Sequence, residues 1–241
     1  MHPYLQVLAL ALLPAFGNFA GGVVAEMVRV DARLLSRSLH LAAGIVVAVV
    51  AVELLPEALG GADPWLVVVG FCLGGLTFAL LDRVIEHFAG DEGSTGPWVI
   101  YAAVFIDLFS DGLMIGIGST VSFGLAFVLA IGQVTADIPE GFATIANFRA
   151  KGVARAKRLL LAASLVAAPV LGASAGYWLL RDQSTSIQLS ALAFTAGLLI
   201  LAAVEEMLGE AHKSDVDSRT TSLFFLAGFA LFVLISSYLG G

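Results

Sequence analysis

The sequence is poor in charged residues. Its 241 residues include 12 Lys and Arg and 19 Asp and Glu, so 13% of the chain is charged and 59% is hydrophobic. An ordinary soluble domain has about a quarter charged residues, which it needs because a domain of this size leaves about a quarter or more of its surface in water. The composition therefore excludes a soluble globular domain, and the high apolar content excludes intrinsic disorder.

Cysteine and positive charge are also scarce. The single cysteine, Cys72, allows neither an internal disulfide nor a thiolate cluster for a structural zinc ion. The formal net charge of -7 argues against nucleic-acid binding, which uses clustered Lys and Arg to neutralise phosphates. Residues 1–16 carry no Lys or Arg ahead of their apolar run and no clear cleavage site, so they predict a retained membrane span.

Long apolar runs make up most of the chain. A membrane-spanning helix needs roughly 20 apolar residues, whereas a transmembrane barrel alternates apolar and polar residues over about ten positions. The runs here are continuous, so the sequence predicts an all-α polytopic membrane protein with a single transmembrane domain over residues 1–241. The eight predicted spans are 4–24, 39–55, 64–81, 97–117, 123–146, 159–180, 187–204 and 222–238.

The few cationic residues are unevenly distributed among the predicted loops. Eleven of the 12 Lys and Arg residues follow the first, third, fifth and seventh spans, and only Arg181 falls in the opposite set of loops. Because cytoplasmic loops are enriched in Lys and Arg, both termini are expected on the extracytoplasmic side of the cell (inner) membrane. A wrong number of spans would mix the two sets, so their separation also supports eight.

No Lys or Arg lies within a predicted span, but carboxylates do. An intramembrane carboxylate is costly unless it is neutralised, paired or hydrated, and the spans offer no cationic partner. The compensating charge must therefore be a proton or a cation from outside the protein. The intramembrane acids are Glu53 in the second span, Asp107 and Asp111 in the fourth, and Asp137 and Glu140 in the fifth.

The acids of the fourth and fifth spans are placed to meet. At a rise of 1.5 Å per residue, Asp107 lies about 15 Å from the start of its helix, near the middle of a bilayer core about 30 Å thick, and Asp137 lies at a similar depth. Asp107 and Asp111 (i, i+4) share one helix face, as do Asp137 and Glu140 (i, i+3). Four converging carboxylates predict an oxygen-rich site for a divalent cation.

Neighbouring residues in the same spans support this cation site. Gln133 extends the acidic face of the fifth span by one turn, and Ser110 adds a hydroxyl beside the fourth-span acids, so both are candidate auxiliary ligands. Pro139 frees the carbonyl of Thr135, which is tolerated at membrane depth only in a cavity or against protein. Protonated acids and ordinary helix contacts are the alternative interpretation.

A short motif occurs twice, in spans that run in opposite directions. The segment Glu-Leu-Leu-Pro-Glu-Ala at 53–58 is similar to Glu-Met-Leu-Gly-Glu-Ala at 206–211. The acids at 107–111 and 137–140 form a second antiparallel pair, each followed by glycine. Inverted repeats with ligands near the midplane are typical of secondary transporters, so this pattern favours alternating access.

Several segments together carry a family resemblance. The most specific is Asp-Ile-Pro-Glu-Gly at 137–141, and weaker ones lie at 52–58, 81–87, 109–112 and 205–212. With the eight-span layout, they resemble the bacterial branch of the ZIP family of divalent-metal transporters. The resemblance implies an inverted repeat of helices 1–3 and 6–8 around helices 4 and 5, and often a homodimer. It also implies uptake of zinc, iron, manganese or similar ions into the cytosol, with metal ligands at Asp107, Asp111, Asp137 and Glu140.

The sequence departs from the family pattern at three points. The fourth-span motif usually begins with His-Asn, and these positions are Asp107 and Leu108 here. The fifth-span motif commonly begins with His or Gln, where this chain has Ala136, and the sixth span lacks the carboxylate of some bacterial members. These departures argue against two bound ions. Carboxylate in place of imidazole also favours harder cations such as manganese, ferrous iron or magnesium.

Polar residues near the span ends form two candidate relays. Glu205, Glu206 and His212, near the cytosolic end of the seventh span, are candidates for an exit relay. Glu53 and Glu57 are candidates for an outer relay. Solvated helix ends are the alternative in both places. His40 is expected to lie at the membrane interface.

Two other function classes stay open at this point. A non-transporting metal-binding sensor or membrane scaffold of the same fold would fit the missing histidine and the missing sixth-span carboxylate. An intramembrane aspartyl protease shares one proton between two aspartates, but its usual Tyr-Asp and Gly-x-Gly-Asp contexts do not accompany the aspartates here. Transport is therefore favoured, and no enzymatic activity is expected.

Overall fold

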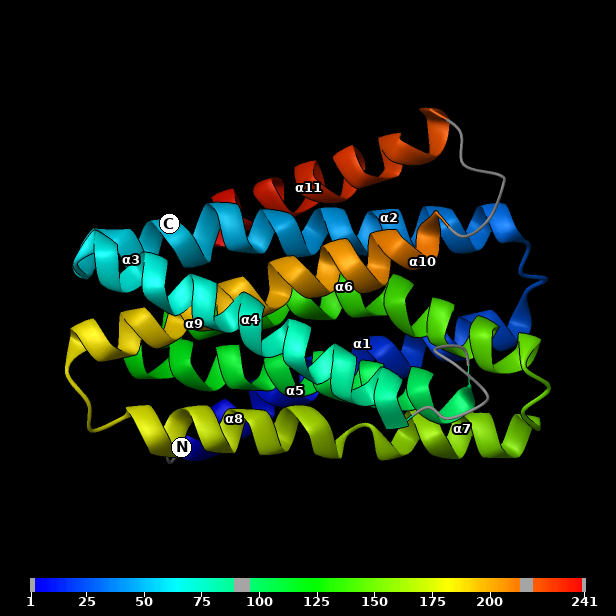
Figure 1. Ribbon diagram of the computed structural model, residues 1–241, viewed down its shortest axis with the longest axis horizontal. Helices are drawn as coiled ribbons and strands as arrows, with labels where there is room; N and C mark the ends of the chain where they lie inside the picture. The colour runs from blue at the N-terminus through cyan, green and yellow to red at the C-terminus, as the bar shows by residue number, and fades with distance from the viewer. Residues whose placement is uncertain (1–2, 89–95, 213–218, 240–241) are drawn as a thin grey trace.

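The computed structural model describes residues 3–88, 96–212 and 219–239. All regular structure within these residues is helical, and eight spans are long and apolar enough to cross a membrane. The spans form one bundle that is longest along the helix axes (Figure 1). The predicted all-α class and the predicted number of spans are confirmed.

Some spans are a single helix, and others consist of two or three consecutive helical segments. Five are single helices: α1 (Pro3–Met27), α4 (Pro64–Phe88), α5 (Pro97–Val121), α6 (Phe123–Ala150) and α11 (Arg219–Leu239). The second span joins α2 (Ala32–Val49), η1 (Val50–Leu54) and α3 (Leu55–Gly61). The sixth joins α7 (Arg155–Ser164) and α8 (Ala167–Leu180). The seventh joins α9 (Thr185–Ala202), η3 (Ala203–Leu208) and α10 (Gly209–Ala211).

Local sequence explains where several helices begin and end. The Asp31 carboxylate accepts a hydrogen bond from the Leu34 amide at 2.7 Å and caps α2. Ser122, the single residue between α5 and α6, accepts one from the Leu125 amide at 3.0 Å and caps α6. After α6, Gly152 has a φ of 72°, a conformation that glycine adopts without strain and that turns the chain toward α7.

The sixth span is interrupted between α7 and α8. Pro169 has no amide hydrogen, and its ring clashes with the carbonyl four residues earlier, at Leu165. The chain makes a tighter turn there, in which the Ala168 amide donates to the Leu165 carbonyl at 3.0 Å. The apolar run at 159–180 is continuous, so its composition alone did not predict the break.

Two spans contain π-helical turns, and both turns overlap the start of a copy of the repeated motif. The segment η1 includes Glu53, and η3 includes Glu205 and Glu206. A π-helical turn is rare within an α-helix and is frequently found at functional sites. The two copies of the motif therefore share a local distortion as well as a sequence.

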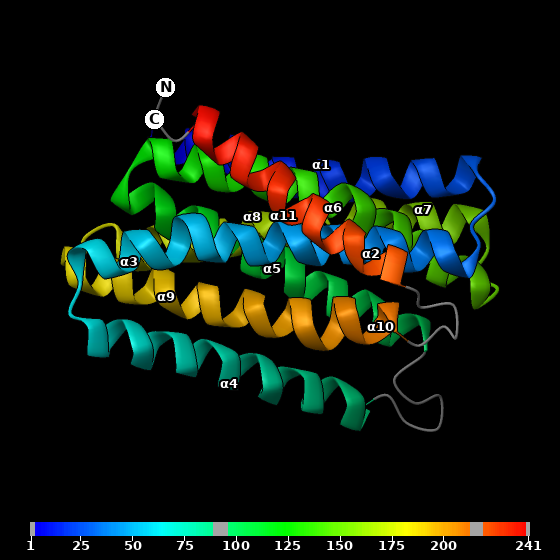
Figure 2. The ribbon, with the colours of Figure 1, turned by 90° about the horizontal axis from the view of Figure 1, so that it is seen from above.

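The helices α5 and α6 lie at the centre of the bundle. Along its length α1 packs against α6, and α8 packs against α5. The helix α4 packs against α9, and α11 against α2, so α4 and α11 lie at the outside, as the two views show (Figures 1 and 2). In the most apolar 18-residue stretch of each outer helix, only 17% of the residues are buried. Most apolar side chains of α4 and α11 therefore face outward.

Basic residues gather at one end of the bundle, which we call the basic end. It comprises the ends of α1, α4 and α6 and the starts of α2, α5 and α7, and it carries Arg29, Arg33, Arg37, Arg83, Arg149, Lys151, Arg155, Lys157 and Arg158. Arg181 lies at the opposite end, with the start of α1 and the end of α11 (Figure 1). Lys213 lies outside the described residues.

Candidate metal site

The two central helices supply the four predicted metal ligands. Asp107 and Asp111 lie on α5, whose midpoint falls at Phe109, and Asp137 and Glu140 lie on α6, whose midpoint falls just before Asp137. The helix α6 continues through Pro139 without a break. All four acids therefore lie near the middle of long, uninterrupted helices.

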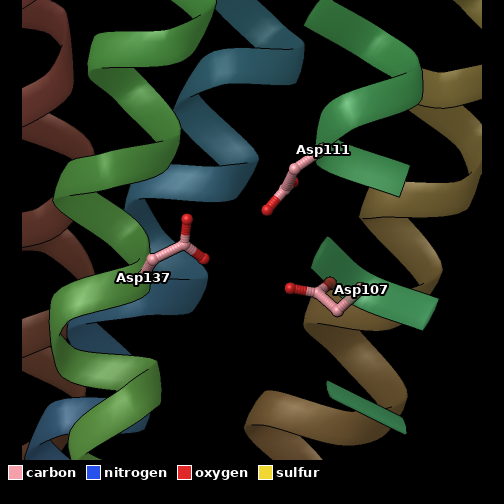
Figure 3. A group of neighbouring side chains, drawn as sticks. All are labelled: Asp107, Asp111 and Asp137. Atoms are coloured by element: carbon pink, nitrogen blue, oxygen red, sulfur yellow. The ribbon is translucent and has the colours of Figure 1, made fainter. Parts of the chain in front are cut away.

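Three of the four acids form a compact cluster. Asp107, Asp111 and Asp137 each place a carboxylate oxygen within 4.8 Å of the other two. Figure 3 shows the two α5 side chains pointing toward Asp137 on α6. The exposed fractions of Asp107, Asp111 and Asp137 are 4%, 0% and 1%. Oxygens on opposite sides of one divalent ion lie about 4 to 5 Å apart, so the cluster has the dimensions of a single-ion site.

Glu140 lies beside this aspartate cluster and extends it along α6. Its carboxyl group lies near enough to those of Asp107 and Asp137 to interact electrostatically with both. It is 7% exposed, and it lines a cavity that none of the three aspartates lines. Glu140 therefore lies between the aspartate cluster and the cavity.

The buried acids have unused oxygen atoms and no cationic partner. Asp107 Oδ1, Asp111 Oδ2, Asp137 Oδ2 and Glu140 Oε2 are buried without a hydrogen-bond partner. Among the residues that the structure describes, no Lys, Arg or His forms an ion pair with any of them. Because each buried, uncompensated charge costs several kcal/mol, the cluster requires protons or a bound cation. Its all-oxygen donor set suits a divalent ion.

The two candidate auxiliary ligands have different partners. Gln133 is 1% exposed, and its Nε2 donates a hydrogen bond to Asp111 Oδ1, which joins α6 to α5. Its Oε1 is buried without a partner. Ser110 is also buried, but it donates its hydroxyl to the Ile106 carbonyl of its own helix at 2.8 Å. The structure thus joins Gln133 to the aspartate cluster, whereas it gives Ser110 a partner within α5.

Close contacts with α1 and α8 fix the two central helices. A Cβ on Gly112, next to Asp111, would overlap the Pro169 carbonyl of α8, and one on Gly141, next to Glu140, would overlap the Asn18 carbonyl of α1. Asn18 is 2% exposed, and its Nδ2 has no hydrogen-bond partner. Sequence reasoning missed Asn18, although an amide in the middle of an apolar span was the available signal.

A cavity of about 370 Å³ leads from Glu140 toward the basic end. It is bounded by the parts of α2, α4, α5 and α6 nearest the basic end and by η3 and α10. Among the residues that the structure describes, no Lys or Arg lines its wall. The carboxylates that line it are Asp82, Glu140, Glu205, Glu206 and Glu210. Two of the exit-relay candidates, Glu205 and Glu206, therefore face the same cavity as Glu140, and His212 follows the wall residue Glu210 by two positions.

The opposite side of the aspartate cluster is apolar. Residues such as Val50, Met114 and Leu129 belong to one buried core between the cluster and the far end of the bundle. The outer-relay candidate Glu53 accepts a hydrogen bond from the Ser236 hydroxyl of α11, and Glu57 is exposed on α3. The structure does not bring this pair to the aspartate cluster.

Comparison with known protein families identifies a match. The family model described as ZIP zinc transporter matches residues 91–236, more than half of the chain. This range includes the aspartate cluster, Glu140, the sixth span and the second copy of the repeated motif. No curated protein matches the chain.

Proposed function

Because the chain belongs to the ZIP zinc transporter family, we propose that it moves divalent transition-metal ions into the cytosol through Asp107, Asp111, Asp137 and Glu140. The family comprises membrane transporters of divalent metals, and the eight apolar helices are those of an integral membrane protein. The observation that carries the proposed site is the buried aspartate cluster, which has oxygen donors to spare and, among the described residues, no cationic partner.

The proposed direction rests on the distribution of charge. The basic end is assigned to the cytosol by the positive-inside rule, which places both termini on the extracytoplasmic side of the cell (inner) membrane. The carboxylate-lined cavity lies at that end, and the opposite side of the aspartate cluster is filled by apolar residues. This arrangement corresponds to a state open to the cytosol, in which the cavity is the exit route.

The proposed alternating access involves an inverted repeat of spans 1–3 and 6–8 around spans 4 and 5. In such a repeat the first span (α1) corresponds to the sixth (which contains α8), and the fourth (α5) corresponds to the fifth (α6). The contact of α1 with α6 therefore has its counterpart in the contact of α8 with α5. The repeat likewise relates the contact of α4 with α9 to that of α11 with α2. These paired contacts, and the π-helical turns at Glu53 and Glu206, support the repeat.

The proposed cargo is one ion per chain from the set of manganese, ferrous iron and zinc. The clustered ligands are carboxylates, which favour harder cations over zinc relative to a site containing imidazole. Competition at the purified protein tests this preference, and displacement of manganese by equimolar zinc would contradict it. The homodimer implied by the family is a further part of the proposal, tested by the mass of the protein in detergent.

Metal flux into proteoliposomes tests the function and the site together. Asp111→Asn and Glu140→Gln keep side-chain size but remove the charge, and we expect each to reduce flux to the level of protein-free liposomes. Asp63→Asn is the matched control, because Asp63 is an exposed carboxylate between α3 and α4, and its flux should equal that of the wild type. Unchanged flux in the two site variants would refute the site. Metal binding without flux in the wild type would identify a sensor or scaffold.

A further inference from the structure

Two of the four histidines meet at the basic end of the bundle. His40 lies on α2 and His212 directly follows α10, which packs against α2. Their ring centroids are 5.1 Å apart, and the ring planes are inclined by 66°. His40 is 2% exposed, whereas His212 is exposed. One imidazole is thus held within the protein and the other faces outward. From the sequence alone, His40 is expected at the membrane interface and His212 in the exit relay, with no link between them.

The backbone fixes the same tautomer in both rings. His40 Nδ1 lies 2.8 Å from the Ser36 carbonyl oxygen, and His212 Nδ1 lies 2.6 Å from the Leu208 carbonyl oxygen. A carbonyl only accepts hydrogen bonds, so each Nδ1 carries the proton. In a neutral ring the lone pair is then on Nε2, the arrangement by which a backbone carbonyl typically orients a metal-binding histidine.

The separation of the rings matches that of two imidazoles on one ion. With zinc–nitrogen distances of about 2.0 to 2.1 Å and tetrahedral angles, two ligated rings have centroids about 5 Å apart. We propose that His40 and His212 form a second divalent-metal site, separate from the aspartate cluster, that binds zinc or a similar borderline cation through the two Nε2 atoms. Metal binding at this histidine site does not depend on whether the protein transports metal.

The histidine pair adjoins the wall of the exit cavity. Leu39 and Glu210 both line the cavity, and they precede His40 by one residue and His212 by two. The histidine pair therefore lies close in sequence to two residues of the cavity wall, beside the proposed exit route. Imidazole binds zinc and other late divalent ions better than carboxylate does, so this site differs in metal preference from the all-oxygen cluster.

X-ray absorption of the zinc-loaded, full-length protein, purified without a histidine tag, tests the site. Imidazole ligands give a distinctive scattering pattern, and the aspartate cluster contains no imidazole to produce it. We expect the pattern in the wild type and its loss in His212→Ala. Because the His212 side chain is exposed, its removal should not impair folding. The control His2→Ala/His87→Ala removes the other two histidines and should retain the pattern.

Equilibrium dialysis with zinc separates this proposal from the proposed function. Asp111→Asn/Asp137→Asn disables the aspartate cluster, and it should still bind one zinc ion with the imidazole pattern. Adding His212→Ala to this variant should remove that ion. Absence of the pattern in the wild type, or its persistence in His212→Ala, would show that the two rings merely pack together and would overturn the proposal, whatever the outcome of the flux assay.

Discussion

Gln133 on α6 donates a hydrogen bond from its side-chain amide to the carboxylate of Asp111 on α5. Both residues are nearly fully buried, and each keeps one oxygen without a partner, Asp111 Oδ2 and Gln133 Oε1. The hydrogen bond orients one aspartate of the cluster and leaves two oxygens for a bound ion. The amide supplies a donor to the Asp111 carboxylate without adding a further negative charge to the cluster.

Replacement of Gln133 by Leu should weaken metal binding by about 10- to 100-fold, as is usual for the loss of a residue that orients a metal ligand. Asp111 loses its donor, and the site loses one oxygen. Gln188→Leu is the matched control, because Gln188 is a buried glutamine of α9 whose amide binds the Leu180 carbonyl. Isothermal titration of the purified variants with manganese measures the effect. Equal affinity in the two variants would show that Gln133 has no part in the site.

Metal binding should weaken on acidification, because a carboxylate must be deprotonated to ligate an ion. The sign follows from the proposed ligation: protons would compete with metal for the same four carboxylates, so affinity should be highest at alkaline pH and decrease as the pH is lowered. Titrations between about pH 8 and about pH 5 measure this dependence, and proton release on binding is measured in weak buffer. Asp107→Asn should release fewer protons per bound ion. A pH-independent affinity would exclude direct ligation by these groups.

Sequence alone was sufficient for the spans and for the central acids because both depend on local properties. Runs of about 20 apolar residues must form helices in a membrane, where every backbone group needs an internal partner. The i, i+4 and i, i+3 spacings of the acids put them on single faces, and the one-residue connection at Ser122 makes α5 and α6 neighbours. The meeting of Asp107, Asp111 and Asp137 follows from these constraints.

Other features depend on contacts between distant segments, which composition does not encode. The cavity wall combines Asp82 of α4 with Glu140 of α6 and Glu206 of η3, and the histidine pair combines α2 with the end of α10. The π-helical turns left no recognisable pattern either, since one extra residue per turn changes the direction of side chains without changing their type. The break at Leu165 was marked only by Pro169.

The ion pair between Glu26 and Arg158 should stabilise the basic end. Arg158 Nε and Nη2 bind the Glu26 carboxylate at 2.6 and 2.8 Å, and both side chains are at least nine-tenths buried. Arg158→Ala removes the buried partner of the Glu26 carboxylate, and we expect a loss of about 3 to 5 kcal/mol in the free energy of unfolding. Arg155 contacts the same carboxylate at 3.5 Å but is 71% exposed.

Arg155→Ala is therefore the internal control for Arg158→Ala. An exposed ion pair contributes at most about 1 kcal/mol, so this variant should unfold close to the wild-type midpoint. Thermal or denaturant unfolding in one detergent, followed by circular dichroism, compares the three proteins. Similar midpoints for the two arginine variants would mean that the buried geometry adds nothing to the stability of the α1–α7 contact.

Narrowing the carboxylate-lined cavity should slow transport without changing the affinity of the aspartate cluster. Ala103 of α5 lines the cavity, whereas its neighbour Ala102 does not. In Ala103→Phe an aromatic ring projects into the proposed exit route, and we expect at least a severalfold loss of metal flux into proteoliposomes. Equilibrium binding in detergent should stay near the wild-type value, because affinity depends on the bound state and not on the width of the route to it. Ala102→Phe adds the same ring to a different face of the same helix and should keep wild-type flux. If Ala103→Phe also transports at the wild-type rate, ions leave by another route, and Glu205 and Glu206 lose their role as the exit relay.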